Sequence, residues 1–376
     1  MKICLIGTVA ASTLNFRKNL IELIVAQGHE IHVFATDYTE SSRKKIQELG
    51  GIPVSYSLNR GGLNPLADIR STLQLKKKIS KISPDIVFSY FSKPVIFGTL
   101  AAKMAGVQHI FGMLEGLGFP FTQTSEKKEE TLKKRIIKNI QINLYKLSFK
   151  HLKKIIFLNK DDYNDLVISN NISSPHYSIL GGIGVDIDFF SKTTPSNNPI
   201  RFIFIGRFLK EKGIFEYIEA AKIVKSKYPD VEFIALGGID KENPSALTQS
   251  QLDSLLADGT IVSPGHVNSV KEWLHKASIF VLPSYREGIP CSTQEALACG
   301  LPIITTNVPG CRETVEHLKN GFIVPPFSSQ DIAESMLFFI ENRDKISLMG
   351  EQSRFLAQST FNSKIQSKKL LEIILS

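Results

Sequence analysis

Short apolar strands alternate with helical segments along the chain, and this alternation limits the possible folds more than any other feature of the sequence. Lys2–Ile6 is an apolar strand, Gly7 begins a loop of small residues, Phe16–Gln27 has helical periodicity, and His29–Ala35 is the next strand. Strands and helices in this order form a parallel sheet with helices on its faces. Such sheets bind ligands beyond the carboxyl ends of their strands, so function is expected in the loops that follow strands.

The alternation begins again after a polar stretch, Ser191–Pro199. A chain of 376 residues is long for a single hydrophobic core and suits two domains. We therefore predict an α/β fold with two Rossmann-like, doubly wound parallel-sheet domains. Residues 1–190 and 191–360 would form the domains, and 361–376 a C-terminal helix.

Two carboxylates flank one helix start in the second domain. The strand Ile279–Leu282 runs into a turn, and a helix opens near Ser292. Glu287 lies in the loop and Glu295 in the first helical turn, while Gly288 lets the backbone approach a ligand closely. Free N–H groups at the helix start favour an anion such as a diphosphate. In the structural alternative, Ser292 and Glu295 form a capping box and Glu287 is a solvated loop charge.

Two cations follow the first strand of the second domain. Gly206 begins a turn that carries Arg207 and Lys212, and the helix Ile214–Lys227 comes next. A planar Arg fork and a mobile Lys charge beside a helix N-terminus can both reach phosphate oxygens. The alternative is a pair of exposed turn cations without a ligand.

Together these residues resemble the signature of the family-four retaining glycosyltransferases, which have the two-domain GT-B fold. Glu287 and Glu295 are separated by seven residues, between a strand ending in Pro-Ser and a helix ending in Ala-x-Gly-x-Pro, and Arg207 and Lys212 match the family's R-x4-K. The resemblance implies that Glu287 holds donor-sugar hydroxyls and Glu295 the nucleotide ribose. It also implies that the domains face each other across a cleft and that the C-terminal helix crosses back to the first domain.

Further donor-binding residues are predicted in the loops after the strands. The chain has no G-x-G-x-x-G motif, so a dinucleotide site is weakly supported. We expect the loop after Val231–Leu236 to lie on the phosphate side and the loop within Ile261–Val267 to hold the base through backbone groups. The predicted donor-binding residues are Gly7, Gly206, Gly238, Gly265, Val267, Gly288, Ile289, Pro290 and Glu295.

Glu115 is the acceptor-side candidate in the first domain. It follows the strand His109–Leu114 and stands between glycines, so it is a site candidate, or else is bound to a local backbone amide. Many relatives carry a His-Asp pair near this point, whereas Glu115 resembles a subgroup acting on polyprenyl-diphosphate-linked sugars. Arg17 is predicted to meet an acceptor phosphate, with a solvated helix arginine as its alternative. The predicted catalytic residues are Arg207, Lys212, Glu287 and Glu115.

The excess positive charge lies in the first half of the chain. Residues 1–190 carry 25 Lys and Arg against 16 Asp and Glu, which gives the whole net charge of +9. Within Phe119–Lys154, basic and apolar residues interleave as in a helix lying on an anionic membrane; the alternative is a domain helix with a solvated lysine face. The aromatic residues form no stacking platform, so no nucleic-acid partner is expected. The basic residues are Lys127, Lys128, Lys133, Lys134, Arg135, Lys138, Lys146, Lys150, Lys153 and Lys154.

No metal or other cofactor is expected. The nucleotide-sugar would be a substrate and not a cofactor. The four cysteines form no C-x-x-C pair, which fits a reducing cytoplasm. Asp186-x-Asp188 invites a metal interpretation, but Gly-Val-Asp followed by Phe resembles the family's interdomain segment. The N-terminal apolar run is too short for a signal peptide, and no run reaches the roughly 18–20 apolar residues of a membrane span. A soluble or peripheral protein is expected.

The resemblance implies sugar transfer with retention of anomeric configuration. We expect a UDP-N-acetylhexosamine donor such as UDP-GalNAc and an undecaprenyl-diphosphate-linked acceptor, used in O-antigen, capsule or protein-glycan assembly at the inner face of the cytoplasmic membrane. One alternative is a UDP-N-acetylglucosamine 2-epimerase of the same fold. Two others are a basic nucleic-acid- or membrane-binding protein without catalysis and a membrane-bound scaffold with a dead site.

Overall fold

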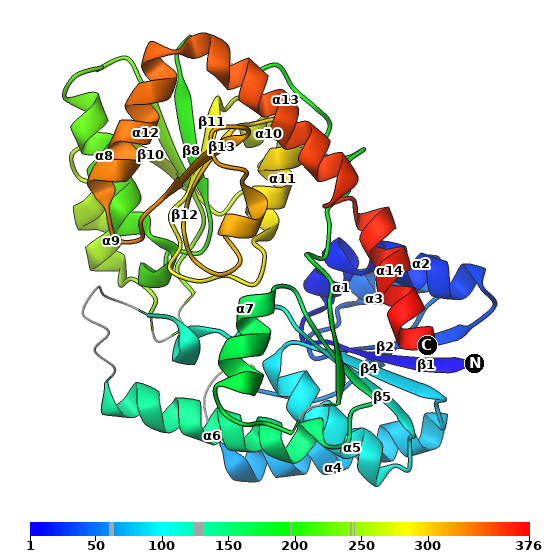
Figure 1. The fold of residues 1–376 in the computed structure, drawn as a ribbon. Coiled ribbons are helices and arrows are strands. Elements are labelled where there is room, and N and C mark those ends of the chain that lie inside the picture. The colour runs from blue at the N-terminus through cyan, green and yellow to red at the C-terminus, as the bar shows by residue number, and fades with distance from the viewer. Residues whose placement is uncertain (60–63, 124–130, 174, 196–197, 241–242, 244) are drawn as a thin grey trace. The chain divides into compact units, whose positions relative to one another are not determined.

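The computed structural model describes residues 1–376 except 60–63, 124–130, 174, 196–197, 241–242 and 244 (Figure 1). The chain divides into two compact units. Unit 1 comprises Met1–Leu117, Leu132–Gly184 and Ser363–Ser376, and unit 2 comprises Gly118–Thr131 and Val185–Asn362.

These limits differ from the predicted domain boundaries. The segment 118–131 groups with unit 2, and the chain passes into unit 2 at Val185 instead of Ser191. The guanidinium of Arg354, in unit 2, donates to the carbonyl oxygens of Ile187 at 3.1 Å and Phe190 at 2.9 Å. These bonds hold the residues before the expected linker within unit 2.

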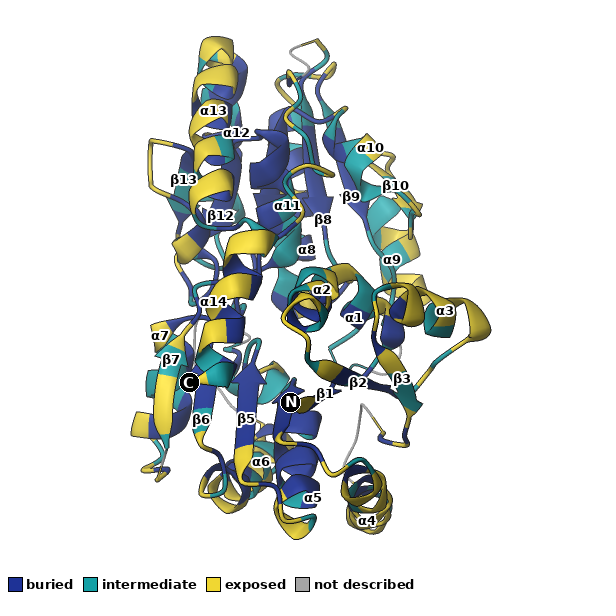
Figure 2. Cartoon of the chain, turned by 90° about the vertical axis from the view of Figure 1, so that its right-hand side faces the viewer, coloured by how far each residue is buried: buried dark blue, intermediate teal, exposed yellow. Residues whose placement is uncertain are grey.

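Unit 1 is built on a seven-stranded parallel sheet in the order β3-β2-β1-β4-β5-β6-β7. The order reverses at β1, as in a doubly wound sheet. Figure 2 shows β1 and β5 largely in dark blue because both lie in the buried interior. The strands are β1 (Lys2–Ile6), β2 (Glu30–Ala35), β3 (Ile52–Ser55), β4 (Ile86–Tyr90), β5 (His109–Leu114), β6 (Lys154–Phe157) and β7 (His176–Ile179).

The helices of unit 1 cover both faces of this sheet. Figure 1 shows α2 and α14 on one side and α4, α5 and α6 on the other. A π-helical turn, Pro94–Gly98, leads into α5. The helices are α1 (Ala10–Phe16), α2 (Lys18–Ala26), α3 (Glu40–Glu48), α4 (Pro65–Ile82), α5 (Thr99–Met104), α6 (Leu132–Phe149), α7 (Lys160–Tyr163) and α14 (Ser363–Leu375).

The first loop is shorter than predicted. Residues from Ala10 are helical, because the Asp37 carboxylate accepts a hydrogen bond from the Ala10 backbone at 2.7 Å and so satisfies an N-terminal N–H of α1. The predicted single helix over Phe16–Gln27 is also wrong at its start. The backbone leaves helical geometry at Arg17, which separates α1 from α2.

Unit 2 contains a six-stranded parallel sheet in the order β10-β9-β8-β11-β12-β13. The two sheets confirm the predicted α/β class; that the two domains face each other across a cleft stays a prediction. The strands are β8 (Arg201–Ile205), β9 (Glu232–Leu236), β10 (Ile261–Gly265), β11 (Ile279–Leu282), β12 (Ile303–Thr306) and β13 (Gly321–Val324). The helices are α8 (Ile214–Lys225), α9 (Gln249–Leu256), α10 (Val270–Leu274), α11 (Cys291–Cys299), α12 (Ser329–Glu341) and α13 (Arg343–Ser359).

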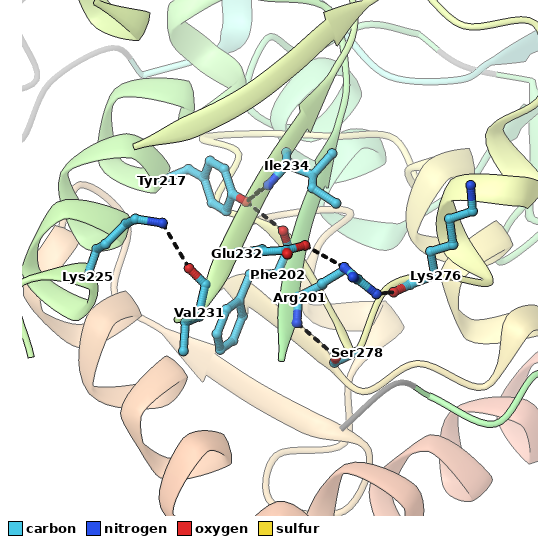
Figure 3. Close-up of polar contacts among 9 residues, drawn as sticks. All are labelled: Arg201, Phe202, Tyr217, Lys225, Val231, Glu232, Ile234, Lys276 and Ser278. Carbon is cyan, nitrogen blue, oxygen red and sulfur yellow. Dashed lines mark hydrogen bonds and ion pairs between the residues drawn. The ribbon is translucent and has the colours of Figure 1, made fainter. Parts of the chain in front are cut away.

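Polar contacts fix the amino ends of the unit 2 strands (Figure 3). Arg201 pairs with Glu232 across β8 and β9, and its backbone N–H donates to Ser278 before β11 at 2.9 Å. The buried Tyr217 hydroxyl donates to the carbonyl oxygen of Phe202 and accepts from the backbone N–H of Ile234. Because the amino ends are held in register, the loops at the carboxyl ends are presented together.

The chain leaves and re-enters unit 1 at neighbouring positions. Val185 pairs with Asn362, and the Val185 N–H donates to the Phe361 carbonyl at 2.8 Å. After this point α14 packs on α2 within unit 1 and buries Leu370, Leu371 and Ile374. The predicted final helix 361–376 therefore begins two residues later, at Ser363.

Candidate functional site

The loops at the carboxyl edge of the unit 2 sheet carry the predicted donor-binding residues. Arg207 follows β8, Gly238 follows β9, and Glu287 follows β11. Gly265 ends β10, with Val267 two positions later. Because β10, β9, β8 and β11 are consecutive in the sheet, the fold gathers these residues at one edge.

Two of these loops are joined into one structure. The Lys212 ammonium donates to the Glu287 carboxylate at 2.5 Å, and the Ser284 hydroxyl donates to the same oxygen at 2.7 Å. The Tyr285 N–H donates to the Glu211 carbonyl at 2.9 Å. Side chains of Lys212 and Glu287 are only 19% and 11% exposed, so the sequence-predicted cation and carboxylate form a largely buried ion pair.

Gly213 allows the two loops to approach this closely. Its φ of +74° lies in the left-handed region, and a Cβ atom at this position would stand 2.1 Å from the carbonyl oxygen of Pro283. Any other residue would push the loop after β8 away from the loop after β11.

Backbone hydrogen bonds connect the loops that carry Gly206, Gly238 and Gly265. The Gly206 N–H donates to the Leu236 carbonyl, the Phe208 N–H to the Gly238 carbonyl, and the Gly237 N–H to the Gly265 carbonyl, each at 3.0 Å. The loops after β8, β9 and β10 therefore form a continuous backbone surface. Such surfaces suit phosphate and base groups that are recognised through main-chain atoms.

Arg207 pairs with a residue that the sequence analysis missed. Its guanidinium donates to Asp240 at 2.6 Å, and the Arg207 side chain is 56% exposed. Among the described residues, Arg207 and Lys212 thus pair with different carboxylates. Asp240 follows β9 at the carboxyl edge, which is the signal that could have identified it.

The start of α11 differs from the capping-box alternative. The N-cap is Pro290, in extended conformation and without a side-chain cap, and the first turn contains no acidic residue. Glu295 therefore lies beyond the first turn, contrary to the sequence prediction. Ile289 and Pro290 are buried directly before the helix.

Glu295 is an unusual carboxyl group for a helix interior. Burial raises the pKa of this side chain to about 8, and among the described residues no hydrogen bond or ion pair to its carboxylate is found. A carboxyl group held without partners in low-dielectric surroundings is a candidate for ligand binding.

In unit 1 the structure brings Arg17 and Glu115 together. Arg17 lies between α1 and α2, Glu115 follows β5, and the guanidinium donates to the Glu115 carboxylate. The Arg17 side chain is only 2% exposed, so the solvated-arginine alternative is wrong. Burial raises the pKa of the Glu115 carboxyl, which the charge of Arg17 opposes. Among the described residues, the buried Nε of Arg17 has no hydrogen-bond partner.

Tyr90 supports this pair, and the sequence analysis missed it. The Arg17 guanidinium lies 4.6 Å from the centroid of the Tyr90 ring, and the Tyr90 hydroxyl is 2.7 Å from that of Thr13. A Cβ atom on Gly7 would meet the Tyr90 hydroxyl at 2.1 Å, so Gly7 is required for packing here. Tyr90 ends β4, and the carboxyl-edge rule could have identified it.

The D-x-D motif has a local structural role. The Asp186 carboxylate accepts hydrogen bonds from the backbone N–H groups of Asp188 at 3.0 Å and Phe189 at 2.9 Å. Across the described ranges, no group of three or more His, Cys, Asp or Glu side chains is arranged to hold a metal ion.

The membrane-facing candidate is helical only in part. Lys133–Lys146 lie in α6, whereas Lys127 and Lys128 fall outside the described residues. In the part of the chain that the structure describes, no helix has the length and apolarity needed to cross a membrane.

Two family models match the two halves of the chain. "Glycosyl transferases group 1" matches residues 186–355, and "Glycosyl transferase 4-like" matches residues 2–159. The chain is a glycosyltransferase. The first match contains Arg207, Lys212, Glu287 and Glu295, and the second contains Arg17 and Glu115.

Relatives of this glycosyltransferase align along most of its length. It is 28% identical to the N,N'-diacetylbacillosaminyl-diphospho-undecaprenol alpha-1,3-N-acetylgalactosaminyltransferase of Campylobacter jejuni, covering 91% of this chain and 90% of the relative. It is 26% identical to the UDP-Gal:alpha-D-GlcNAc-diphosphoundecaprenol alpha-1,3-galactosyltransferase of Escherichia coli, covering 69% and 67%. The structure of HepE from Anabaena with UDP and glucose superposes with a TM-score of 0.78 at 16% identity, covering 100% of this chain and 99% of HepE. The glycosyltransferase thus has the GT-B fold.

Proposed function

We propose that this glycosyltransferase moves an N-acetylhexosamine, in the first instance GalNAc, from a UDP-sugar to a sugar hydroxyl on an undecaprenyl-diphosphate-linked acceptor, with retention of configuration. The observation that supports the donor site in this proposal is the joined pair of loops at the carboxyl edge of unit 2, in which Lys212 and Glu287 form an ion pair. The nature of the donor and acceptor is supported by the Campylobacter relative, which spans nearly the same length.

The donor would be held by groups already placed at this edge. Glu287 can accept hydrogen bonds from sugar hydroxyls, and Lys212 beside it can reach the β-phosphate. Arg207 is exposed and can swing from Asp240 to the diphosphate. Glu295, which has no partner among the described residues, can bind the two ribose hydroxyls.

The proposed reaction exchanges one bond at the anomeric carbon for another. The bond between this carbon and the β-phosphate oxygen breaks, and a bond to the acceptor oxygen forms on the same face. The acceptor's proton passes to the departing β-phosphate, so no separate protein base is required. Arg207, Lys212 and the N–H groups at the start of α11 stabilise the growing negative charge, and the proposal needs no metal ion or cofactor.

The acceptor would meet the Arg17–Glu115 pair in unit 1. A buried guanidinium with an unpartnered Nε offers a directional donor to a sugar hydroxyl or phosphate oxygen. The Glu115 carboxylate can accept a hydrogen bond from a sugar hydroxyl and orient that hydroxyl. Both residues stand at the carboxyl edge of their sheet, where ligands of this fold class bind.

We also propose that the enzyme works as a peripheral protein at the inner face of the cytoplasmic membrane. The excess of basic residues in 1–190 favours an anionic leaflet, with each basic residue near the surface contributing about 1 kcal/mol. Vesicles containing anionic lipid should bind the protein, and raised salt should release it. Equal binding to neutral vesicles would contradict the electrostatic part of this proposal.

The central test is incubation of the purified protein with UDP-, GDP- and ADP-sugars, with and without an undecaprenyl-diphosphate-linked sugar. Nucleotide release and extended lipid would be followed by mass spectrometry, in the presence and absence of EDTA. Extension by one UDP-sugar, insensitive to EDTA and with an α-linkage retained from the donor, is the expected result.

Other outcomes assign other functions. Conversion of a UDP-sugar without acceptor would favour the 2-epimerase. No turnover with any donor, together with vesicle or nucleic-acid binding, would favour a binding protein or a scaffold. Arg207→Ala should lower kcat more than donor affinity, and Glu295→Ala should weaken nucleotide binding; normal kinetics in both variants would contradict the donor site.

A further inference from the structure

An apolar groove runs between three helices on one face of unit 1. Its volume is about 540 Å³, within the range of roughly 300–1,000 Å³ found for ligand sites. α4, α5 and α6, which Figure 1 shows on the same side of the sheet, supply its walls. The apolar side chains that carry the argument are Ile69, Leu73, Leu100, Met104, Ile140 and Leu147.

Five of these six side chains are exposed although they are large and apolar, and Leu100 is half-buried. Ile69 is 57% exposed, Leu73 48%, and Met104 and Leu147 45% each. On α6 the exposed apolar residues recur with helical spacing at Leu132, Ile136, Ile140 and Leu147, so they form one stripe. Figure 2 shows α4 with much of its surface exposed. A continuous exposed apolar surface of this kind indicates a binding site.

One end of the groove lies at the carboxyl edge of the sheet. α4 begins there because it follows β3, and Asp68 in its first turn lines the groove. Lys93, which follows β4, donates to the Asp68 carboxylate at 3.1 Å. Lys103 and His151, after the helices have run back along the sheet, line the groove at its other end.

The same end and the candidate acceptor site follow neighbouring strands of the sheet. Tyr90 and Met113 are paired neighbours in β4 and β5, and the Phe91 N–H donates to the Met113 carbonyl at 3.1 Å. Lys93 comes three residues after Tyr90, and Glu115 comes two residues after Met113. Lys93, which contacts the lining residue Asp68, and the candidate acceptor residue Glu115 therefore follow adjacent strands.

We propose that this groove binds the first isoprene units of the acceptor's polyprenyl chain, with the diphosphate directed toward Lys93. This inference rests on the proposed function. Lys93 lies beside this end of the groove through its contact with the lining residue Asp68, and an apolar groove with a cation beside it matches a hydrocarbon chain attached to an anion. A bound diphosphate would take Lys93 from Asp68, while the attached sugar lies toward Arg17 and Glu115. Proximity to that pair favours the acceptor's own chain over a bulk phospholipid, which needs no contact with the site.

The test compares acceptors that differ only in chain length. The full-length protein would be assayed in mixed micelles with an undecaprenyl-diphosphate-linked sugar and with the same sugar diphosphate carrying one isoprene unit. The ratio of the two kcat/KM values is the readout. Leu73→Glu and Leu147→Glu place a charge in the groove and should lower this ratio by about tenfold or more. Ile168→Glu, at a 57% exposed residue outside the groove, is the matched control and should leave it unchanged.

Photolabelling supplies a readout that does not depend on turnover. Undecaprenyl diphosphate with a diazirine in its first isoprene units should label α4, α5 or α6 peptides, and Leu147→Glu should reduce the labelling about fivefold or more. Labelling elsewhere, an unchanged chain-length ratio, or equal labelling by a phospholipid probe or a bound helical peptide would overturn the inference. If no acceptor is extended but the groove is still labelled, the proposed function fails and the groove assignment stands.

Discussion

The ion pair between Arg207 and Asp240 has a direct consequence for donor binding. An exposed pair of this kind contributes about 0.2–1 kcal/mol, and a diphosphate bound at the proposed donor site would compete with it. Asp240→Asn should therefore lower the Kd for UDP by up to about fivefold, measured by calorimetry. Asp253→Asn, in α9 of the same unit, should have no effect. If Asp240→Asn instead weakens UDP binding as much as Arg207→Ala, Asp240 orients the arginine and does not compete for it.

Glu295 makes stability depend on pH in the direction opposite to most carboxyl groups. Burial raises its pKa from 4.5 to about 8, so the folded protein retains a proton that the unfolded chain releases. The stability that this group contributes is fully present below pH 4.5 and is lost as the pH rises toward about 8.

Glu295→Gln should remove this loss. The variant should be more stable than the parent at pH 8, on the order of 1–3 kcal/mol, and equally stable near pH 4. Urea unfolding of both proteins at the two pH values, without nucleotide, measures the difference. A difference that does not change with pH would show that folding leaves the pKa of Glu295 unshifted.

At the scale of elements, the joined loops after β8 and β11 can be tested through glycines. Gly213→Ala adds left-handed strain of about 1–2 kcal/mol and also a contact 2.1 Å from the Pro283 carbonyl. Gly259→Ala, at a φ of +69° with open space around it, adds the strain alone. Thermal unfolding should show a larger loss for Gly213→Ala, and only this variant should lose donor binding. Equal losses would mean that the loops are not coupled.

Strong local patterns predicted several elements correctly. The strands Lys2–Ile6, His109–Leu114 and Ile279–Leu282 were predicted at their observed limits, because mainly apolar runs bounded by Gly, Pro or polar residues leave little choice. Long-range contacts decided the elements that were wrong or missed. α1 depends on Asp37, which lies 27 positions from Ala10, and the short exposed strand β7 carries no apolar run.

Candidate site residues could be predicted from the sequence where they lie close together along the chain. Arg207, Lys212 and the two glutamates could be proposed from the sequence because each pair lies within a short interval of the chain. The Arg17–Glu115 pair joins residues 98 positions apart, so the sequence indicated each candidate but not their contact. The groove of unit 1 could not be predicted from the sequence. The pattern of each of its three helices does not show that their exposed apolar residues lie next to one another.

At the scale of the whole molecule, the last helix should stabilise the first unit. Leu370 is 3% exposed in α14, which packs on α2. Leu370→Ala should cost about 2–5 kcal/mol, whereas Ile365→Ala, at a 39% exposed position of the same helix, should change stability by about 0.5 kcal/mol or less. Hydrogen exchange should locate the loss in unit 1. Faster exchange confined to unit 2 would contradict the assignment of α14.

The pairing of Val185 with Asn362 gives the chain the anatomy of a domain insertion. Residues 185–362 leave the first unit and return to it at adjacent points, while both termini belong to unit 1. Segments with neighbouring ends can be exchanged or circularly permuted without long new linkers. Residues 185–362, which carry the proposed donor site, could therefore be replaced by the corresponding segment of a relative. If the proposed donor site is correct, this exchange should alter the donor sugar.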